Sequence, residues 1–89
     1  MTISKRITSS GLVDNGYHNL FAVTINKAGK TITVVRLRNS LDNSGEILWE
    51  FWGNVAGCFV KQFEPSLLFD TGIYADITGE IYSVIVEDH

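Results

Sequence analysis

The chain of 89 residues contains one cysteine, Cys58, and no long run of apolar residues. A single cysteine cannot close a disulfide within the chain, so a disulfide-stapled fold is excluded. Nowhere do 18 apolar residues follow one another, and the N-terminal segment has no apolar core of signal-peptide length. We therefore expect a soluble protein that is made and kept in a reducing compartment.

Charge is also scarce. Charged residues make up 19% of the chain and hydrophobic residues 45%, with a formal net charge of −3. An average domain has roughly 25% charged residues, so the composition indicates a compact globule rather than a disordered chain. A weakly acidic chain lacks the basic surface that nucleic acids and anionic membranes attract, and we predict neither as a partner.

Residues arranged for catalysis or for metal binding are missing as well. Neither GxGxxG nor GxxxxGK, the glycine-rich phosphate loops, occurs in the sequence. His18 and His89 have no Cys or Glu pair at the spacing of zinc ligands. Cys58 opens an apolar run beside Phe59, where a cysteine usually behaves as a small buried hydrophobe. We predict no catalytic residue, no cofactor and no metal site.

What the sequence does contain is a series of short apolar or alternating runs, separated by clusters of Gly, Asn, Asp and Ser. The runs are rich in β-branched and aromatic residues, which favour strands, and no window keeps the apolar period of a helix. This pattern predicts an all-β chain, a small antiparallel β-sandwich of seven to eight short strands. We expect one domain over residues 1–89, with residues 1–16 as an N-terminal arm plus first strand. The runs span residues 3–8, 17–25, 31–38, 46–52, 58–63, 73–77 and 81–87.

The tripeptide Asp70-Thr71-Gly72 follows an apolar run, as the catalytic aspartate of aspartic proteases does. Such a site needs two aspartates that share a proton, and a short chain would have to pair to supply them. It also needs a flap and a second half of the core after the aspartate, yet only 17 residues (89 − 72) follow Gly72. We therefore predict a turn. The stretch LDNSGE, residues 41–46, imitates a calcium loop but has its glycine one place early, and it predicts a hairpin turn.

Two strands carry apolar residues on both faces. In the run 46–52, alternation places Trp49 and Phe51 on one face and Leu48 and Trp52 on the other. A small sandwich covers one face of each sheet by itself, so the second face is covered by loops or meets another subunit. The candidate subunit interface comprises Leu48, Trp52, Tyr82, Val84 and Val86.

Two arginines, Arg36 and Arg38, share one face of the run 31–38. They are candidates for contact with an anion or a partner protein. The alternative is a solvated strand face that discourages pairing between sheets.

The C-terminal stretch LLFDTGIYADITG, followed by the strand YSVIVED, resembles small proteins of tailed bacteriophages and related viruses. These end in a phrase like F-x-x-G-[LI]-Y-[VA]-x-I-[TG]-G before a hydrophobic strand. The chain departs from the family where Arg38-Asn39-Ser40 stands, since family members carry an aspartate and a glycine after the second core strand. The matching residues are Phe69, Gly72, Ile73, Tyr74, Ala75, Ile77, Thr78 and Gly79.

The resemblance implies a jelly-roll-like sandwich in the virion that performs no chemistry. The expected role is a non-enzymatic structural protein, either a capsid decoration (cement) protein or a small fibre or tail module. Its expected partners are further copies of itself, with a trimer favoured, and the major capsid protein or another virion protein. The alternative is a module that binds a glycan or a host surface, with Trp52 and Asn54 as an aromatic sugar platform.

Overall fold

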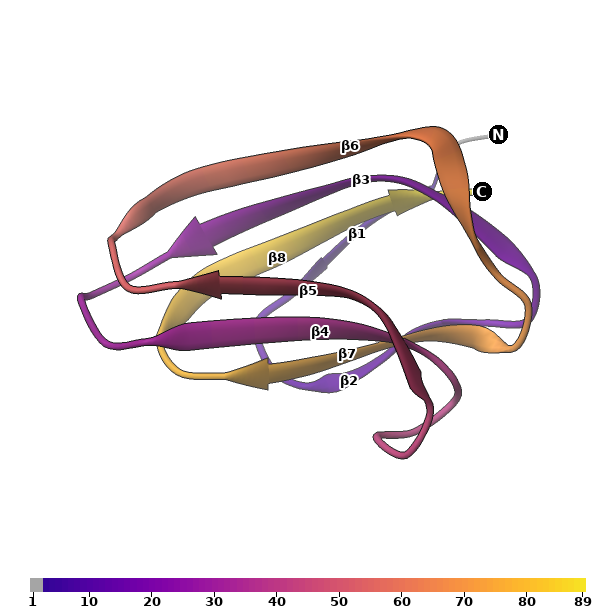
Figure 1. Ribbon diagram of the computed structural model, residues 1–89, viewed down its shortest axis with the longest axis horizontal. Coiled ribbons are helices and arrows are strands. Elements are labelled where there is room, and N and C mark those ends of the chain that lie inside the picture. Colours follow the sequence, from indigo (N-terminus) through magenta and orange to yellow (C-terminus); the bar gives the residue numbers. More distant parts are fainter. Residues whose placement is uncertain (1–2) are drawn as a thin grey trace.

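The computed structural model describes residues 3–89, which form eight β-strands and no helix (Figure 1). The all-β prediction is confirmed. Within residues 3–89 there is no helix of the length and hydropathy that would cross a membrane. The strands are β1 (Ile3–Ile7), β2 (Gly11–Asn15), β3 (His18–Lys27), β4 (Thr33–Asn39), β5 (Glu46–Gly53), β6 (Gly57–Phe69), β7 (Gly72–Thr78) and β8 (Ile81–Asp88).

The strands build two four-stranded antiparallel sheets, in the orders β1-β8-β3-β6 and β2-β7-β4-β5. β1 pairs with β8, β2 with β7, β3 with β6 and β4 with β5, so the chain is one long hairpin closed by residues 40–45. The hairpin is wound so that β3 also pairs with β8 and β4 with β7. This winding is the double-sheet jelly roll, and it confirms the predicted jelly-roll-like β-sandwich.

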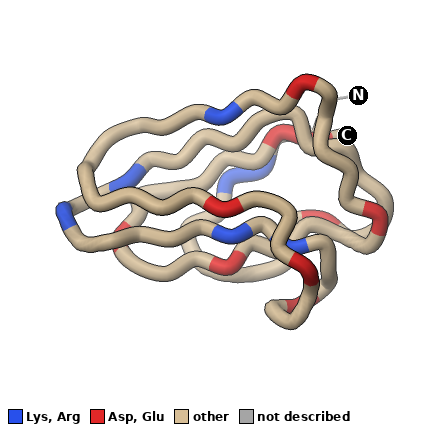
Figure 2. Tube along the Cα trace, viewed as in Figure 1, with Lys and Arg blue, Asp and Glu red and all other residues tan. Residues whose placement is uncertain are grey.

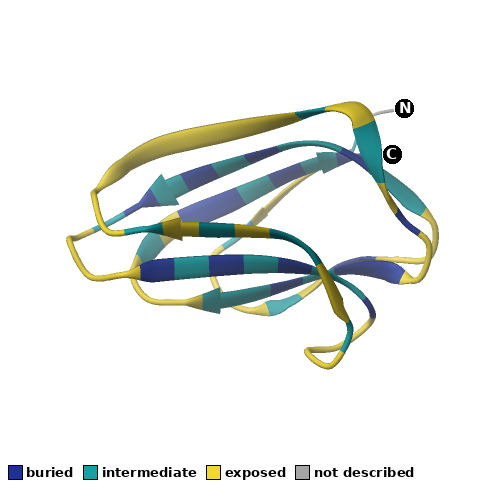
Figure 3. Cartoon of the chain, in the orientation of Figure 1, coloured by how far each residue is buried: buried dark blue, intermediate teal, exposed yellow. Residues whose placement is uncertain are grey.

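The hydrophobic core lies between the two sheets. Alternate residues of the interior strands point into it, which Figure 3 shows as dark bands along β4 and β8. Eleven apolar side chains are buried there: Val13, Leu20, Val23, Ile25, Val35, Leu37, Phe69, Ile73, Ala75, Val84 and Val86. Ile7, Leu48, Trp49, Phe51, Phe63, Leu67, Ile77 and Ile81 pack against this core from positions that are only partly buried.

The strand boundaries differ from the sequence prediction at two places. The sequence pattern assigns residues 9–16 to a break, but Gly11–Asn15 is a strand paired with β7. The described part of the predicted N-terminal arm is therefore two strands of the sandwich, while residues 1–2 lie outside the described residues. β6 is also longer than the run 58–63, because it continues through Pro65 to Phe69.

Bulges change which side chains face the core. At four places in the described residues one strand carries an extra residue opposite its partner: Val13 in β2, Phe21 in β3 (opposite β8), Leu48 in β5 and Tyr82 in β8. A bulge lets two successive residues point to the same side of the sheet. Val13 and Asp14 are consequently both buried, and Leu48 and Trp49 both pack against the core.

The two glycines that belong to the C-terminal phrase are explained by close approach. A Cβ on Gly72 would lie 2.9 Å from the carbonyl oxygen of Asp14. Gly79 has φ of 100°, and a Cβ there would collide with the carbonyl oxygen of Ile32. Positive φ and backbone contact both favour a residue without a side chain. The two glycines of the phrase are therefore explained by the close packing of the turns on either side of β7.

Candidate functional site

The five residues of the predicted subunit interface do not share one surface. Val84 and Val86 are fully buried in the core, which corrects the expectation that their face is open to a partner. The reason is that β8 is an interior strand whose valines point toward the other sheet. Leu48 turns inward at its bulge. Trp52 and Tyr82 are exposed, but they lie on different sheets.

On one side of the sandwich, aromatic side chains bridge the two sheets. On this side β6 is the edge strand of one sheet and β5 that of the other, and the two are not hydrogen-bonded to each other; β1 and β2 are the edge strands on the opposite side. The ring of Trp49 meets that of Phe63 edge-on, with centroids 5.9 Å apart, and Phe51 lies 5.1 Å from Phe59. Trp49 packs against the core while Trp52 is 60% exposed, as the alternation in residues 46–52 predicts.

The outer edge of this side is apolar and uncovered. Residues 57–62 of β6 are exposed at every position, so neither face of this part of the strand is buried (Figure 3). We define the open edge as Trp52, Val55, Phe59 and Val60, whose exposed fractions are 60%, 63%, 37% and 62%. An edge strand also presents unpaired backbone N–H and C=O groups along its free side. The open edge therefore combines apolar side chains with free backbone pairing groups.

Cys58 lies on this exposed part of β6, so its predicted burial is wrong. β3 flanks β6 on one side, and no described strand flanks it on the other. A Cys–His catalytic pair is excluded by the ladder, because Cys58 pairs with Asn26 and His18 with Phe69. The eight residue steps along β3 from His18 to Asn26 (26 − 18) separate the two pairs by roughly 25 Å at the rise of a strand.

The two arginines of the predicted anion contact are engaged within the chain. Arg36 Nε lies 2.6 Å from Glu50 Oε2, and Arg38 Nη2 lies 3.1 Å from Asp76 Oδ2. Arg38 also donates to the carbonyl oxygen of Gly45 and is largely buried. Figure 2 shows basic and acidic residues interspersed rather than gathered by sign. Contact with an outside anion stays a prediction that requires these ion pairs to open.

The predicted turn at Asp70-Thr71-Gly72 is confirmed, since these residues link β6 to β7. The side chain of Asn39 braces the turn: its amide donates to Asp70 Oδ1 at 2.7 Å and its oxygen accepts from the Thr71 N–H at 2.9 Å. The Asn39 amide, followed by the Thr71 hydroxyl, holds the pKa of Asp70 below its usual range. Asn39 belongs to Arg38-Asn39-Ser40, where the sequence differs from the phage phrase. Its side chain stabilises this turn.

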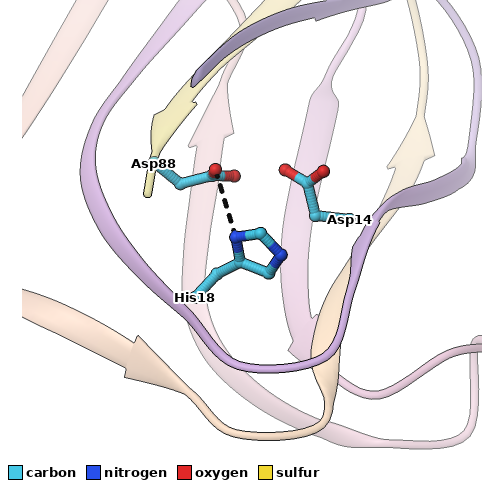
Figure 4. Close-up of side chains that lie close together, drawn as sticks. All are labelled: Asp14, His18 and Asp88. Atoms are coloured by element: carbon cyan, nitrogen blue, oxygen red, sulfur yellow. Dashed lines mark ion pairs between the residues drawn. The ribbon is translucent and has the colours of Figure 1, made fainter. Parts of the chain in front are cut away.

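A buried polar cluster lies at the end of the sandwich where β2, β3 and β8 approach one another. Asp14 of β2, His18 of β3 and Asp88 of β8 each offer an atom within 4.8 Å of the other two (Figure 4). Asp88 is fully buried and Asp14 nearly so, while the His18 side chain is 16% exposed. The bulge at Val13 is what turns Asp14 inward from β2.

Hydrogen bonding fixes the orientation of the imidazole. His18 Nε2 lies 2.9 Å from the carbonyl oxygen of Asn15. A carbonyl only accepts, so Nε2 carries the proton, and in the neutral ring Nδ1 presents a lone pair to Asp88 Oδ1 at 3.4 Å. Lys5 Nζ pairs with Asp14 Oδ1 at 2.6 Å. Within residues 3–89, Asp14 Oδ2 and both oxygens of Asp88 have no hydrogen-bond partner.

The two carboxyl groups have opposite pKa shifts. Burial and, after it, the facing Asp14 carboxyl raise the pKa of Asp88 to about 7, and the positive charge of Lys5 and of a protonated His18 limits this rise. Burial acts in the same sense on Asp14, but the Asp88 carboxyl and the Lys5 ammonium together hold its pKa below the usual range. The pair therefore keeps one proton mainly on Asp88 in neutral and weakly acidic solution.

This cluster is absent from the sequence prediction because its members come from three strands, one of which the sequence pattern assigns to a break. A signal was nevertheless present. Val84, Val86 and Asp88 follow one another at the two-residue period of one strand face, so an acid at the end of β8 continues the core face.

Comparison with known proteins adds no relative. No family model, no curated protein and no solved structure matches the chain. The likeness of the C-terminal phrase to small phage proteins therefore stays a prediction.

Proposed function

We propose that this chain is a non-enzymatic structural protein of a bacteriophage particle, either a capsid decoration (cement) protein or a small fibre or tail module. We propose further that it assembles as a homo-oligomer through the open edge. The open edge is the observation that carries the assembly. The virion role is supported by the resemblance of the C-terminal phrase and, by analogy, by the jelly-roll winding that many capsid proteins share.

β6 is the edge strand that could pair with a second copy of the chain. Residues 57–62 are exposed on both strand faces, and the free side of the strand can pair with another chain. Such an edge in a chain that stays monomeric is usually protected by charge, proline or a covering loop. Here Lys61 is the single charged side chain in residues 57–62.

Covering the open edge would remove Trp52, Val55 and Val60 from water together with the exposed flank of Phe59. Aromatic and large aliphatic side chains of this kind are the usual anchors of subunit contacts. A trimer is the favoured assembly, because threefold positions recur on icosahedral heads. That preference depends on the phage resemblance, whereas the assembly itself depends on the exposed residues.

Light scattering after size exclusion, at micromolar concentrations, tests the assembly. We expect the natural chain to run as an oligomer, with a trimer favoured, and Val60→Lys to run as a 9.9 kDa monomer. The matched control is Tyr17→Lys, because Tyr17 is equally exposed but lies in the turn between β2 and β3. A natural chain that is monomeric at every concentration would contradict the proposal, as would equal dissociation of both variants.

Mass spectrometry of purified phage particles tests the virion role separately. The chain is expected among the particle proteins at a copy number that matches a set of symmetry positions. Its absence from particles would overturn the virion role, whatever its oligomeric state. Its presence in particles as a solution monomer would keep the virion role and overturn the homo-oligomer.

A second candidate function is favoured by Trp52 alone. Its ring is 60% exposed, and the neighbouring Asn54 is also exposed, which is the arrangement of an aromatic platform beside a polar partner for a sugar. Quenching of tryptophan fluorescence across a glycan panel tests this role. Binding that Trp52→Ala abolishes and Val60→Lys leaves intact would favour the glycan-binding module over the subunit contact.

A further inference from the structure

We propose that Asp14, His18 and Asp88 form a binding site for a divalent cation of the zinc type. The carrying observation is that His18 Nδ1, Asp14 Oδ2 and both oxygens of Asp88 are buried without a hydrogen-bond partner among the described residues, on three side chains that lie close together (Figure 4). Asp88 is fully buried, and neither of its oxygens has a hydrogen-bond partner in the part of the chain that the structure describes. A buried carboxylate without a partner is costly, so something that carries positive charge or a proton belongs beside it.

The geometry fits a small coordination sphere. Zinc binds imidazole nitrogen and carboxylate oxygen at about 2.0–2.2 Å, so two ligands at a tetrahedral angle lie roughly 3.3–3.6 Å apart. His18 Nδ1 and Asp88 Oδ1 are 3.4 Å apart, which meets that requirement without movement. Asp14 needs only a side-chain adjustment, since all three ligand atoms lie within 4.8 Å of one another.

Neighbouring groups already orient two of the three ligands. His18 donates its other ring proton to the carbonyl oxygen of Asn15, and such a bond sets the tautomer that a metal-binding imidazole needs. Asp14 Oδ1 is held by Lys5, which leaves Oδ2 free for the cation. The partly exposed ring of His18 gives the cation a route in.

The ligand set selects the class of cation. One imidazole with two carboxylates suits zinc and its transition-metal neighbours, whereas magnesium and calcium prefer oxygen ligands alone. Three protein ligands leave a fourth position for water. Because Asp14 belongs to one sheet and His18 and Asp88 to the other, the cation would tie the two sheets together.

Lys5, which lies against Asp14, is expected to affect the affinity for the cation. Its ammonium lies against Asp14 and is about half exposed, so it competes with the cation by charge repulsion yet can swing into solvent. Removing that charge with Lys5→Met is expected to tighten zinc binding severalfold. A site that depended on surface carboxylates elsewhere would not respond to this change.

The test is thermal unfolding of chelator-stripped protein with and without zinc chloride, in a Cys58→Ser background. That background removes the exposed thiol, a soft ligand that would bind zinc on the surface. At a free zinc concentration about a hundred times the Kd, the midpoint is expected to rise by about 10–20 °C. Magnesium chloride at the same concentration is expected to leave the midpoint unchanged.

Variants locate the site. Asp88→Asn and His18→Gln are expected to weaken zinc binding by more than about 100-fold, since loss of an outer-shell partner alone costs about 10–100-fold. The control is His89→Gln, because that histidine stacks on Phe21 instead of joining the cluster, and it should bind zinc as the reference does. Cobalt(II) supplies a readout that needs no variant, because a four-coordinate site gives visible absorption far stronger than the hydrated ion.

Two outcomes would overturn the proposal. Zinc that gives no rise in midpoint and cobalt that gives no new absorption would mean that a proton or a water molecule satisfies the cluster. A rise that persists in Asp88→Asn and His18→Gln, with both variants folded by circular dichroism, would place the zinc elsewhere.

Discussion

The open edge and the buried cluster invert the usual distribution of residues in opposite ways. At the open edge, Trp52 and Val60 are apolar and exposed. In the cluster, Asp14 and Asp88 are acidic and buried, although carboxyl groups are normally left in water. Each arrangement costs free energy in the isolated chain.

The two features differ in the kind of partner that could satisfy them. Apolar surface with free backbone groups suits another copy of the same edge, which is the assembly we propose. Converging lone pairs are matched by a cation or a proton. The two features share no residue, so each can be removed by substitution without touching the other.

The largest effect is expected from Trp49, three residues from Trp52 on the same strand. Trp49→Ala should lower the free energy of unfolding by about 3 kcal/mol, the low end for a large aromatic because the ring is only partly buried. Trp52→Ala should change the subunit's stability by no more than about 0.5 kcal/mol. It should instead weaken the oligomer by about 2 kcal/mol, as loss of an interface anchor does.

Urea unfolding of both variants, each at a concentration where the chain is monomeric, separates these effects. If Trp52→Ala unfolded as readily as Trp49→Ala, the open edge would be part of the fold rather than a contact surface.

The next effect concerns Asp88 in metal-free protein. Its pKa is about 7 in the folded chain against 3.8 in the unfolded one. Between pH 3.8 and about 7, Asp88 is therefore protonated in the folded chain and ionised in the unfolded chain. This contribution to stability is full below about pH 4 and is lost as the pH rises toward 7. Asp14 acts in the opposite sense: its lowered pKa stabilises above the ordinary value and that stability is lost at lower pH.

Asp88→Asn removes the contribution of the Asp88 carboxyl to the pH dependence of the free energy of unfolding. The asparagine amide can donate toward His18 and Asp14 at any pH, so the variant should be more stable at pH 8 by about 1–3 kcal/mol, the usual penalty of an unsatisfied buried group. Free energies of unfolding measured from pH 4 to 8 with chelator present check this. Parallel pH curves for the variant and the natural chain would mean that Asp88 does not hold the proton.

The smallest effect is a change of rate at Cys58. In dilute monomer the exposed thiol should react with a maleimide as quickly as a cysteine in a short peptide. At concentrations where the chain is assembled, coverage of β6 should slow the labelling severalfold. Val60→Lys should label quickly at both concentrations, and protection that survived in this variant would place the interface away from the open edge.

The fold class was predictable because alternation and turn residues act locally. Seven of the eight strands correspond to apolar runs, and the turn at Asp70 follows from residues that favour turns. The strand β2 was missed, since Gly11, Asp14 and Asn15 are all turn formers and only its pairing with β7 makes it a strand. Propensity is overridden there by tertiary contact.

By itself the sequence determined that the chain is an all-β sandwich and that Trp49 and Trp52 lie on opposite faces of one strand. Only the tertiary structure decided that Val84 and Val86 are core, that Cys58 is exposed and that Asp14 meets Asp88. The physical reason is that exposure depends on which strand becomes an edge, and facing depends on where a bulge adds a residue. Both are set by pairing between segments far apart in the chain, such as β2 with β7 and β3 with β8, and local alternation carries no record of them.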